Sequence, residues 1–552
     1  MTERFSQLDQ SPRRLRPDLW TPGALAIAVV VLAPVVSILW LALTPTENIW
    51  PHLMATVLPR YMATTLGLML GVAALTAMMG TGAAWLVSQY QFPGRFWLKH
   101  ALLFPLAIPA YVGAYALVDF LDYAGPLQSA LRTAFGWSSA RDYWFPETRS
   151  LWAAVLVLSF ALYPYVYLLA RAAWREQSGR SYEVARALGC GPVAVFLRVG
   201  LPLARPAVAA GVALALMETV ADYGTVQHFG VQTLTTGIFS TWLNGGNAGG
   251  AAQIALVILA LILLLVGLER AGRGKARFHR LGRGARAVEP QPLTGARGWL
   301  ASALCLFPVA GGFLLPVGVM AAQSLAAPQG WLAPGLVEAL RNTLVVAGVA
   351  ALATVGAALY LVYALRMAGS RIAAMVLPVT LIGYAAPGAV LALGLLVPLA
   401  ALDHRLADAV LAATGRDPGL MITGTAFALG LAYLVRFFGI AQGALDAAYG
   451  RVAPSLPMAA RSLGRTPGGT LAAVYLPLMR GSVLTALLVV FVDCVKELPA
   501  TLLLRPFDYN TLATRVFELA SLERLSEAAP AALVVMAVGM AAVAVLAREQ
   551  KD

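Results

Sequence analysis

Two copies of one short motif decide the fold: Ser181-Tyr-Glu-Val-Ala-Arg-Ala-Leu-Gly-Cys-Gly-Pro192 and Pro457-Met-Ala-Ala-Arg-Ser-Leu-Gly-Arg-Thr-Pro467. In each copy a run rich in Ala and Arg stops at a glycine, Gly189 or Gly464, and a proline follows three places later. Glycine accepts the left-handed conformation that ends a helix at the lowest cost, and proline suits the first turn of a new helix. The motif therefore predicts a helix-turn-helix elbow that occurs twice.

The two elbows belong to a longer repeat. Their glycines, prolines and following Leu-Pro pairs, Leu201-Pro202 and Leu476-Pro477, all lie 275 positions apart. Three further pairs of segments recur at nearly the same distance: Thr64-Thr65-Leu66 with Asn342-Thr343-Leu344, Pro109 with Pro387, and 234–239 with 512–517. A repeat of this length indicates two similar halves in one chain.

The composition is that of a membrane protein. Hydrophobic residues make up 59% of the 552 residues and charged residues only 12%. Uncharged runs long enough to cross a bilayer recur along the chain. The net charge of +13 lies mostly in short segments between these runs, where basic residues orient a membrane protein. We therefore interpret the charge as a topology signal and expect no nucleic-acid partner.

The apolar runs predict an all-α polytopic membrane protein with about twelve transmembrane helices, arranged as two parallel six-helix repeats. The expected spans are roughly 24–43, 62–88, 98–120, 150–172, 203–223 and 251–268, then 298–322, 342–365, 372–401, 419–442, 479–498 and 529–547. The expected domains are an N-terminal tail at 1–20, a first half at 21–268, a basic linker at 269–296 and a second half at 297–552. An even span count and the positive-inside bias place both termini, both elbows and the linker in the cytoplasm.

The elbow motif resembles the cytoplasmic coupling loop of the membrane subunits of ABC importers. The glycine and Leu-Pro spacing of that loop is intact in both copies, whereas its Glu-Ala-Ala start is altered at Val184 and at Met458. The resemblance implies that both elbows contact an ATPase, through Glu183, Ala185, Arg186, Gly189, Pro192, Met458, Ala459, Ala460, Arg461, Gly464 and Pro467. We expect Glu183 in the first turn of its helix, and Pro457 at the start of the second helix.

The resemblance also implies partners. The chain contains no Gly-x-x-x-x-Gly-Lys-Ser/Thr phosphate-binding loop. We therefore expect ATP and Mg to bind a homodimer of cytoplasmic ABC ATPase subunits, while this chain is no enzyme and holds no cofactor. A periplasmic solute-binding protein and the lipid bilayer are the other expected partners. The expected location is the bacterial inner membrane, multi-pass, with both termini cytoplasmic.

A second notable stretch, Asp493-Cys-Val-Lys-Glu-Leu-Pro-Ala-Thr501, follows the eleventh span. Its Lys-Glu-Leu-Pro-Ala-Thr part resembles that of ferric-iron ABC importer permeases in which two halves are fused. Ionisable side chains at this depth are costly and indicate a pathway or gate. The candidates, including two acids at the equivalent first-half positions, are Glu218, Asp222, Asp493, Lys496 and Glu497. The alternative is an interfacial position in which Lys496 simply pairs with Glu497.

The expected function is the permease subunit of an ATP-binding-cassette importer that translocates ferric iron delivered by a periplasmic binding protein. Thiamine, polyamine, sulfate or phosphonate stay open as solutes within the same class. A gradient-driven secondary transporter is the alternative from a different class, because twelve spans in two parallel halves also describe such carriers. The tyrosines near the third and fourth spans are interpreted as packing residues, and no resident metal site is expected.

Overall fold

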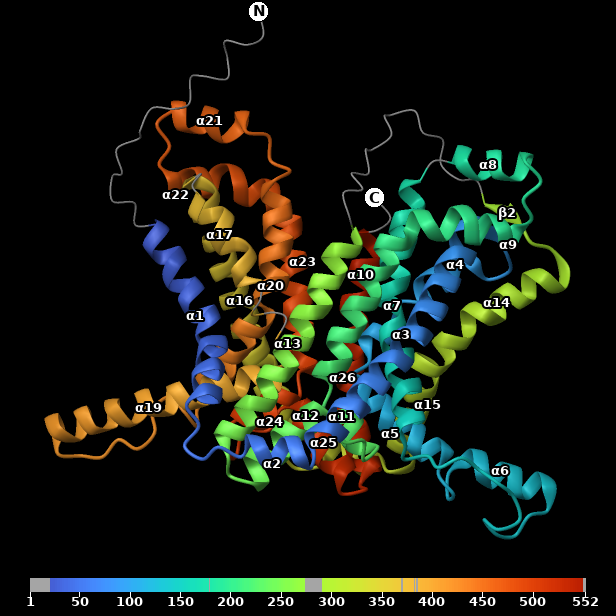
Figure 1. Cartoon of the computed structure of the whole chain (residues 1–552), viewed down its shortest axis with the longest axis horizontal. Helices are drawn as coiled ribbons and strands as arrows, with labels where there is room; N and C mark the ends of the chain where they lie inside the picture. The colour runs from blue at the N-terminus through green and yellow to red at the C-terminus, as the bar shows by residue number, and fades with distance from the viewer. Residues whose placement is uncertain are drawn as a thin grey trace, which may run out of the picture.

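The computed structural model describes residues 20–177, 179–273, 290–368, 371–381, 383 and 386–549. The predicted tail before Trp20 and linker residues 274–289 lie outside these ranges. Within them, eleven helices are long and apolar enough to cross a membrane, and a bent helix pair can supply a twelfth crossing. The expected polytopic all-α architecture is therefore confirmed (Figure 1).

The first half contains α1 (Trp20–Leu43), α2 (Trp50–Ala55), α3 (Leu58–Gln89), β1 (Tyr90–Gln91), α4 (Arg95–Ala101), η1 (Phe104–Ala107), α5 (Ala110–Leu121), α6 (Pro126–Phe135), α7 (Leu151–Glu176), α8 (Gly179–Ala187), α9 (Pro192–Val195), η2 (Phe196–Gly200), α10 (Leu201–Ala221), α11 (Gly224–His228), α12 (Leu234–Phe239), η3 (Ser240–Asn244) and α13 (Ala248–Arg273). The second half contains β2 (Gln291–Pro292), α14 (Gly295–Val309), η4 (Ala310–Leu314), α15 (Leu315–Ala326), η5 (Pro328–Leu332), α16 (Leu336–Ala368), α17 (Arg371–Thr380), α19 (Gly388–Thr414), α20 (Ala426–Tyr449), α21 (Ser455–Ser462), α22 (Pro467–Thr470), η6 (Leu471–Tyr475), α23 (Leu476–Lys496), α24 (Pro499–Leu504), α25 (Leu512–Ser521) and α26 (Leu525–Glu549). The strands β1 and β2 form one short parallel pair.

The third span of each half is broken. The segment expected at 98–120 divides into α4 with η1 and α5 with α6, and these two parts are bent by 97°. Pro109 stands immediately before α5, as Pro387 does before α19. Proline lacks an N–H donor and disfavours helical backbone in the residue before it. The expectation of continuous helices at 98–120 and 372–401 is therefore wrong.

The first span of each half packs on the opposite half. α1 lies beside α16 and α19 (Figure 1), and Trp20 stacks on Tyr360 with ring centroids 5.0 Å apart. α15 lies against α5, where the Gln323 side-chain amide donates to the Asp119 carboxylate at 3.0 Å. The two halves are therefore interlocked rather than merely adjacent.

The repeat predicted from the sequence forms the same contact twice. In the first half, Thr65 of α3 accepts the backbone N–H of Leu234 at 3.0 Å. In the second half, Thr343 of α16 accepts the backbone N–H of Leu512 at 2.8 Å. The helix that starts at each of these leucines also carries a threonine capping box. The parallel drawn between these segments is confirmed.

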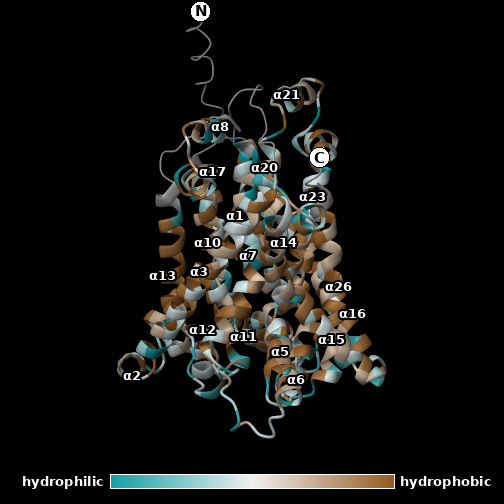
Figure 2. Cartoon of the chain, turned by 90° about the vertical axis from the view of Figure 1, so that its right-hand side faces the viewer, coloured by the Kyte–Doolittle hydropathy of each residue, from teal (hydrophilic) through white to brown (hydrophobic). Residues whose placement is uncertain are grey.

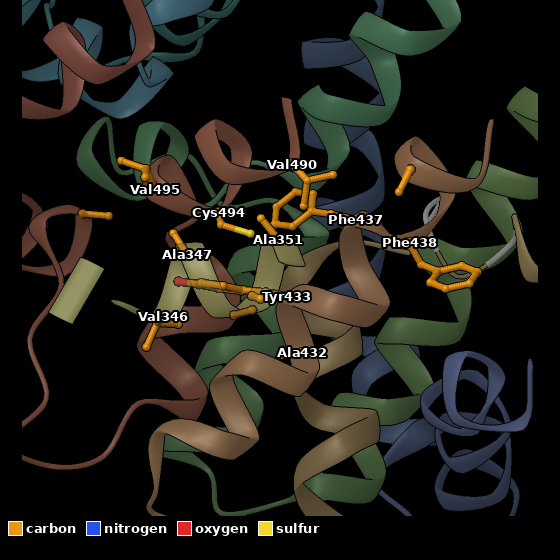
Figure 3. Close-up of a cluster of buried hydrophobic side chains, with 14 of the residues drawn as sticks. Val346, Ala347, Ala351, Ala432, Tyr433, Phe437, Phe438, Val490, Cys494 and Val495 are labelled. Carbon is orange, nitrogen blue, oxygen red and sulfur yellow. The ribbon is translucent and has the colours of Figure 1, made fainter. Parts of the chain in front are cut away.

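Hydrophobic residues predominate along the long helices, whereas α8 and α21 lie beyond one end of this apolar belt and α6 lies near the other (Figure 2). Within the second half, α16, α20 and α23 meet in a buried cluster (Figure 3). Val490 and Cys494 of α23 belong to that cluster and are 0% and 2% exposed. Because these residues, four apart, face the core, other positions of α23 are free to face the first half.

Candidate functional site

A central cavity of about 160 Å³ lies between the two halves, at the ends of α10 and α23. The short helices α11 and α24, which follow these ends, lie far from α8 and α21 (Figure 1). The cavity is lined by all five residues predicted as a pathway or gate: Glu218, Asp222, Asp493, Lys496 and Glu497. The structure thus brings together residues that are 275 positions apart in the sequence.

Asp222 and Glu497 occupy equivalent positions and make equivalent hydrogen bonds. Each residue has extended backbone at the end of a long helix. Each carboxylate accepts the backbone N–H groups three and four residues later, at 3.0 and 3.1 Å for Asp222 and at 3.1 Å twice for Glu497. Thr225 and Thr501 add a hydroxyl donor at 2.9 and 3.0 Å. Both acids therefore stabilise the start of a short helix, α11 or α24.

Lys496 pairs with Asp493, not with Glu497. The Lys496 Nζ lies 2.8 Å from Asp493 Oδ1, one helical turn away. Glu497 lies beyond the end of α23, and its Oε1 is 3.5 Å from Nε of Arg436 on α20. The alternative interpretation, in which Lys496 pairs with Glu497, is wrong, because the helix ends at Lys496 and the next side chain turns toward α24.

Two glycines allow the close approach at this cavity. A Cβ at Gly388 would lie 2.3 Å from Glu497 Oε1, so a side chain there would displace the carboxylate. A Cβ at Gly224 would lie 2.7 Å from Leu498 Cδ2 and 2.8 Å from Tyr111 Cβ. The start of α11 therefore lies directly against Leu498, the residue that precedes α24, at the end of the cavity.

Two further polar residues line the cavity: Arg436, which sequence reasoning did not assign, and Tyr111, which it interpreted as a packing residue. Arg436 is a charged residue within the expected span 419–442, which is a signal of function that could have been used. Tyr111 carried no such signal, because tyrosine is common in helical bundles. Its hydroxyl is buried and has no hydrogen-bond partner among the residues that the structure describes.

No metal-binding cluster is preformed in the described part of the chain, since no three His, Cys, Asp or Glu side chains converge there. Three of the four cavity acids, Asp222, Asp493 and Glu497, are instead held by helix N–H groups, threonine hydroxyls or basic side chains. A cation in this cavity would therefore meet charged walls and not a closed ligand set.

Both elbows have the predicted backbone. Gly189 and Gly464 have φ values of +80° and +83°. The N–H of each glycine donates to the carbonyl three residues before it, at 2.9 and 3.0 Å, and the next N–H donates to the carbonyl five residues before it, at 3.0 and 3.1 Å. This is the Schellman arrangement that ends a helix. Pro192 and Pro467 open α9 and α22 as predicted.

The elbow helices begin earlier than expected. α8 begins at Gly179, so Glu183 lies in its second turn and not its first. α21 begins at Ser455 after Pro454, so Pro457 is its third residue. The two spans that follow also begin earlier than 203 and 479, because π-helical turns join each elbow to them without a break.

The predicted coupling residues lie at the surface with one exception. Those that are exposed are Glu183, Gly189, Pro192, Met458, Ala459, Arg461, Gly464 and Pro467, and those that are half-buried are Arg186 and Ala460. Ala185 is buried in a hydrophobic cluster that also contains Trp85 and Trp174. Sequence reasoning missed Leu188 and Leu463, which are 79% and 85% exposed at equivalent positions.

Tryptophan supports the first elbow. Trp85 contacts Trp174, Tyr182 and Phe196, with ring centroids between 5.1 and 5.8 Å apart. The Trp174 indole N–H donates to the Gly200 carbonyl at 3.0 Å. The elbow therefore rests on an edge-to-face aromatic cluster anchored by one hydrogen bond.

Tyrosine supports the second elbow. Tyr449 and Tyr475 are stacked with centroids 4.6 Å apart, and the Tyr475 hydroxyl donates to that of Tyr449 at 3.0 Å. Tyr363, at the position equivalent to Trp85, donates to the Pro467 carbonyl at 2.6 Å. This elbow is held by hydroxyl hydrogen bonds as well as by ring packing.

The sequence of this chain is similar to those of known transport permeases. Residues 76–271 match the family described as binding-protein-dependent transport system inner membrane component. The Fe(3+)-transport system permease protein FbpB 2 of Haemophilus influenzae is 26% identical over 486 residues, which cover 86% of this chain and 87% of that protein.

Shorter matches involve permeases for oxyanions. A probable sulfate transport system permease protein of Nephroselmis olivacea is 30% identical over 164 residues, 30% of this chain and 55% of that protein. The molybdenum transport system permease protein ModB of Mycobacterium bovis is 31% identical over 175 residues, 30% of this chain and 62% of that protein. The similarity to the iron permease extends over far more of the chain.

Proposed function

Because this chain is a permease of the binding-protein-dependent transport family, the membrane component of an ABC importer, we propose that its cargo is ferric iron. The observation that carries this proposal is the charge of the central cavity. Four carboxylates line it against one lysine and one arginine. Such a wall attracts a cation and repels an oxyanion.

Sulfate and molybdate fit this cavity poorly. Lys496 and Arg436, the basic side chains that line it, are already paired with Asp493 and Glu497. An oxyanion would have to displace these carboxylates to reach a positive charge, and it would leave an acid buried and unpaired. Similarity over most of the length of an Fe(3+)-transport permease supports the same choice.

The test is uptake by cells that lack this chain. Loss of binding-protein-dependent ferric iron uptake, with normal uptake of sulfate, molybdate and a polyamine, is the expected result. Restoration by the plasmid-borne chain serves as the control. Normal iron uptake together with loss of another solute would remove iron as the cargo.

We also propose that ATP and Mg bind a pair of identical ATPase subunits, one on each elbow, and that this chain has no ATPase activity of its own. Two elbows with the same backbone suit two copies of one partner. The exposed Leu188 and Leu463 offer each copy an apolar anchor at equivalent positions. The purified chain alone should hydrolyse no ATP, and hydrolysis by the chain without a partner would contradict this division of labour.

The elbows, the linker and both termini are proposed to face the cytoplasm, with the periplasmic binding protein on the opposite side. The support is the arginine excess around the first elbow and in the linker. A reporter fused near Gly284, in the linker, should therefore report cytoplasm. Periplasmic reporter activity at this position would contradict the orientation.

A further inference from the structure

The four cavity acids form two equivalent pairs that are not equally engaged. At a spacing of 275, Glu218 corresponds to Asp493 and Asp222 corresponds to Glu497. Asp222 and Glu497 both cap short helices, so their oxygens are largely committed to N–H and hydroxyl donors. The difference between the two halves therefore rests on Glu218 and Asp493.

The cavity-lining residues of each half are called here the first-half wall and the second-half wall. The second-half wall contains two basic residues. Asp493 is paired with Lys496 at 2.8 Å, and Glu497 lies 3.5 Å from Arg436. At the same spacing, Lys496 corresponds to Ala221 of the first half, and Arg436 corresponds to Ala161. Both alanines line the cavity. The first-half wall therefore has no basic side chain at the two positions that are basic in the second half.

Glu218 is the uncommitted acid. None of the described residues forms a hydrogen bond or salt bridge with it. Tyr111 also lines this cavity, but its hydroxyl, which has no partner among the described residues, is fully buried beneath the surface of the wall. By the spacing of the two broken spans, 278, Tyr111 corresponds to Ala389. Glu218 is therefore the one cavity carboxylate without a partner among the described residues.

We propose that the cargo cation is held in transit on the first-half wall, by the Glu218 carboxylate, while Lys496 and Arg436 keep the second-half wall closed to it. This inference rests on the proposed cation cargo. Carboxylate oxygens are hard donors that suit a hard trivalent cation. A single free carboxylate holds such an ion loosely enough to release it, as transport requires.

The test uses the purified full chain in vesicles with its ATPase and ferric-loaded binding protein. Glu218→Gln should lower iron uptake by about ten- to a hundredfold, the loss expected for a hydrogen-bonded charge. Glu218→Asp keeps the charge and should retain much of the uptake. Asp493→Asn should cost less than Glu218→Gln, because Lys496 already neutralises Asp493. Binding-protein-stimulated ATP hydrolysis reports whether each variant is folded and coupled.

A charge placed on the first-half wall gives a second measurement. Ala221→Lys copies the second half and should suppress iron uptake by roughly tenfold or more, whereas Ala221→Met adds similar bulk without charge and should retain more uptake. Equal uptake by Glu218→Gln and the wild type, or equal losses in the Gln and Asp variants, would overturn the inference. Equal losses in the Lys and Met variants would overturn it too. A wild-type chain that carries an oxyanion and no iron would instead refute the proposed function.

Discussion

The two elbows and the two walls of the cavity have diverged to different degrees since they arose from one repeat. The elbows share a left-handed glycine, a Schellman ending, an opening proline and an exposed leucine at equivalent positions. The walls share their acids, but their basic residues and Tyr111 are not repeated, because Lys496, Arg436 and Tyr111 have alanine counterparts. Two copies of one ATPase require two similar docking sites. A single cargo ion imposes no such symmetry, so the two walls of its path can differ in charge.

The largest expected effect comes from substitutions in the two elbows, which are the symmetric part of the molecule. Gly189→Val and Gly464→Val should each abolish coupled ATP hydrolysis and transport. Valine at positive φ costs about 1 to 2 kcal/mol and would redirect the elbow helix. A Cβ at either glycine would have no heavy atom within 4 Å, so steric clash is not the cause. ATP hydrolysis by the reconstituted complex provides the measurement.

Asparagine is the matched control at these glycines. It tolerates the left-handed conformation far better than valine does, so Gly189→Asn and Gly464→Asn should keep most of the coupling. Wild-type hydrolysis in both valine variants would show that the elbows do not transmit the ATPase motion. A loss at only one elbow would break the proposed symmetry.

An intermediate effect should separate the two helix caps. Glu497→Ala removes a cap and leaves Arg436 without its acid, so we expect a loss of about 3 kcal/mol in unfolding free energy. Asp222→Ala removes a cap alone and should cost about 1 kcal/mol. Thermal unfolding of the purified variants in detergent would measure the difference. Equal destabilisation would mean that Arg436 contributes nothing to the second-half wall.

The smallest expected effect concerns the supports beneath the elbows. Tyr363→Phe and Tyr449→Phe each remove one hydroxyl hydrogen bond and should lower stability by about 1 kcal/mol while leaving ring packing intact. Transport should fall only slightly. Differential scanning of each variant against the wild type would show the shift. No shift in either variant would make ring packing the sole support of the second elbow.

Much of the fold follows from local patterns in the sequence. The apolar runs predict the spans because a bilayer sets their length, and the Gly-Pro spacing predicts the elbow backbone because few residues adopt positive φ. The exchange of α1 and α14–α15 between the halves has no such signal, since it depends on packing between distant segments. The breaks at Pro109 and Pro387 were within reach of the sequence, because proline interrupts helices.

Five charged residues of the site were predicted from the sequence, but Arg436 and the pairing of the charges were not. Glu218, Asp222, Asp493, Lys496 and Glu497 stand out because charges are rare in apolar spans. The partner of Lys496 depends on where α23 ends, and helix ends are uncertain by a residue or two from sequence alone. On a helix Lys496 faces Asp493, three residues earlier, and not the adjacent Glu497, so the pair follows only if the helix reaches Lys496.

The most direct measurement is ATP-driven uptake by the purified chain, reconstituted in vesicles with its ATPase and binding protein. Radiolabelled ferric iron, sulfate and molybdate would be supplied in parallel, each with the binding protein that carries it. A cavity with uncompensated acids on one wall predicts that iron accumulates and that neither oxyanion does. Accumulation of sulfate or molybdate without iron would contradict a cation path along this cavity.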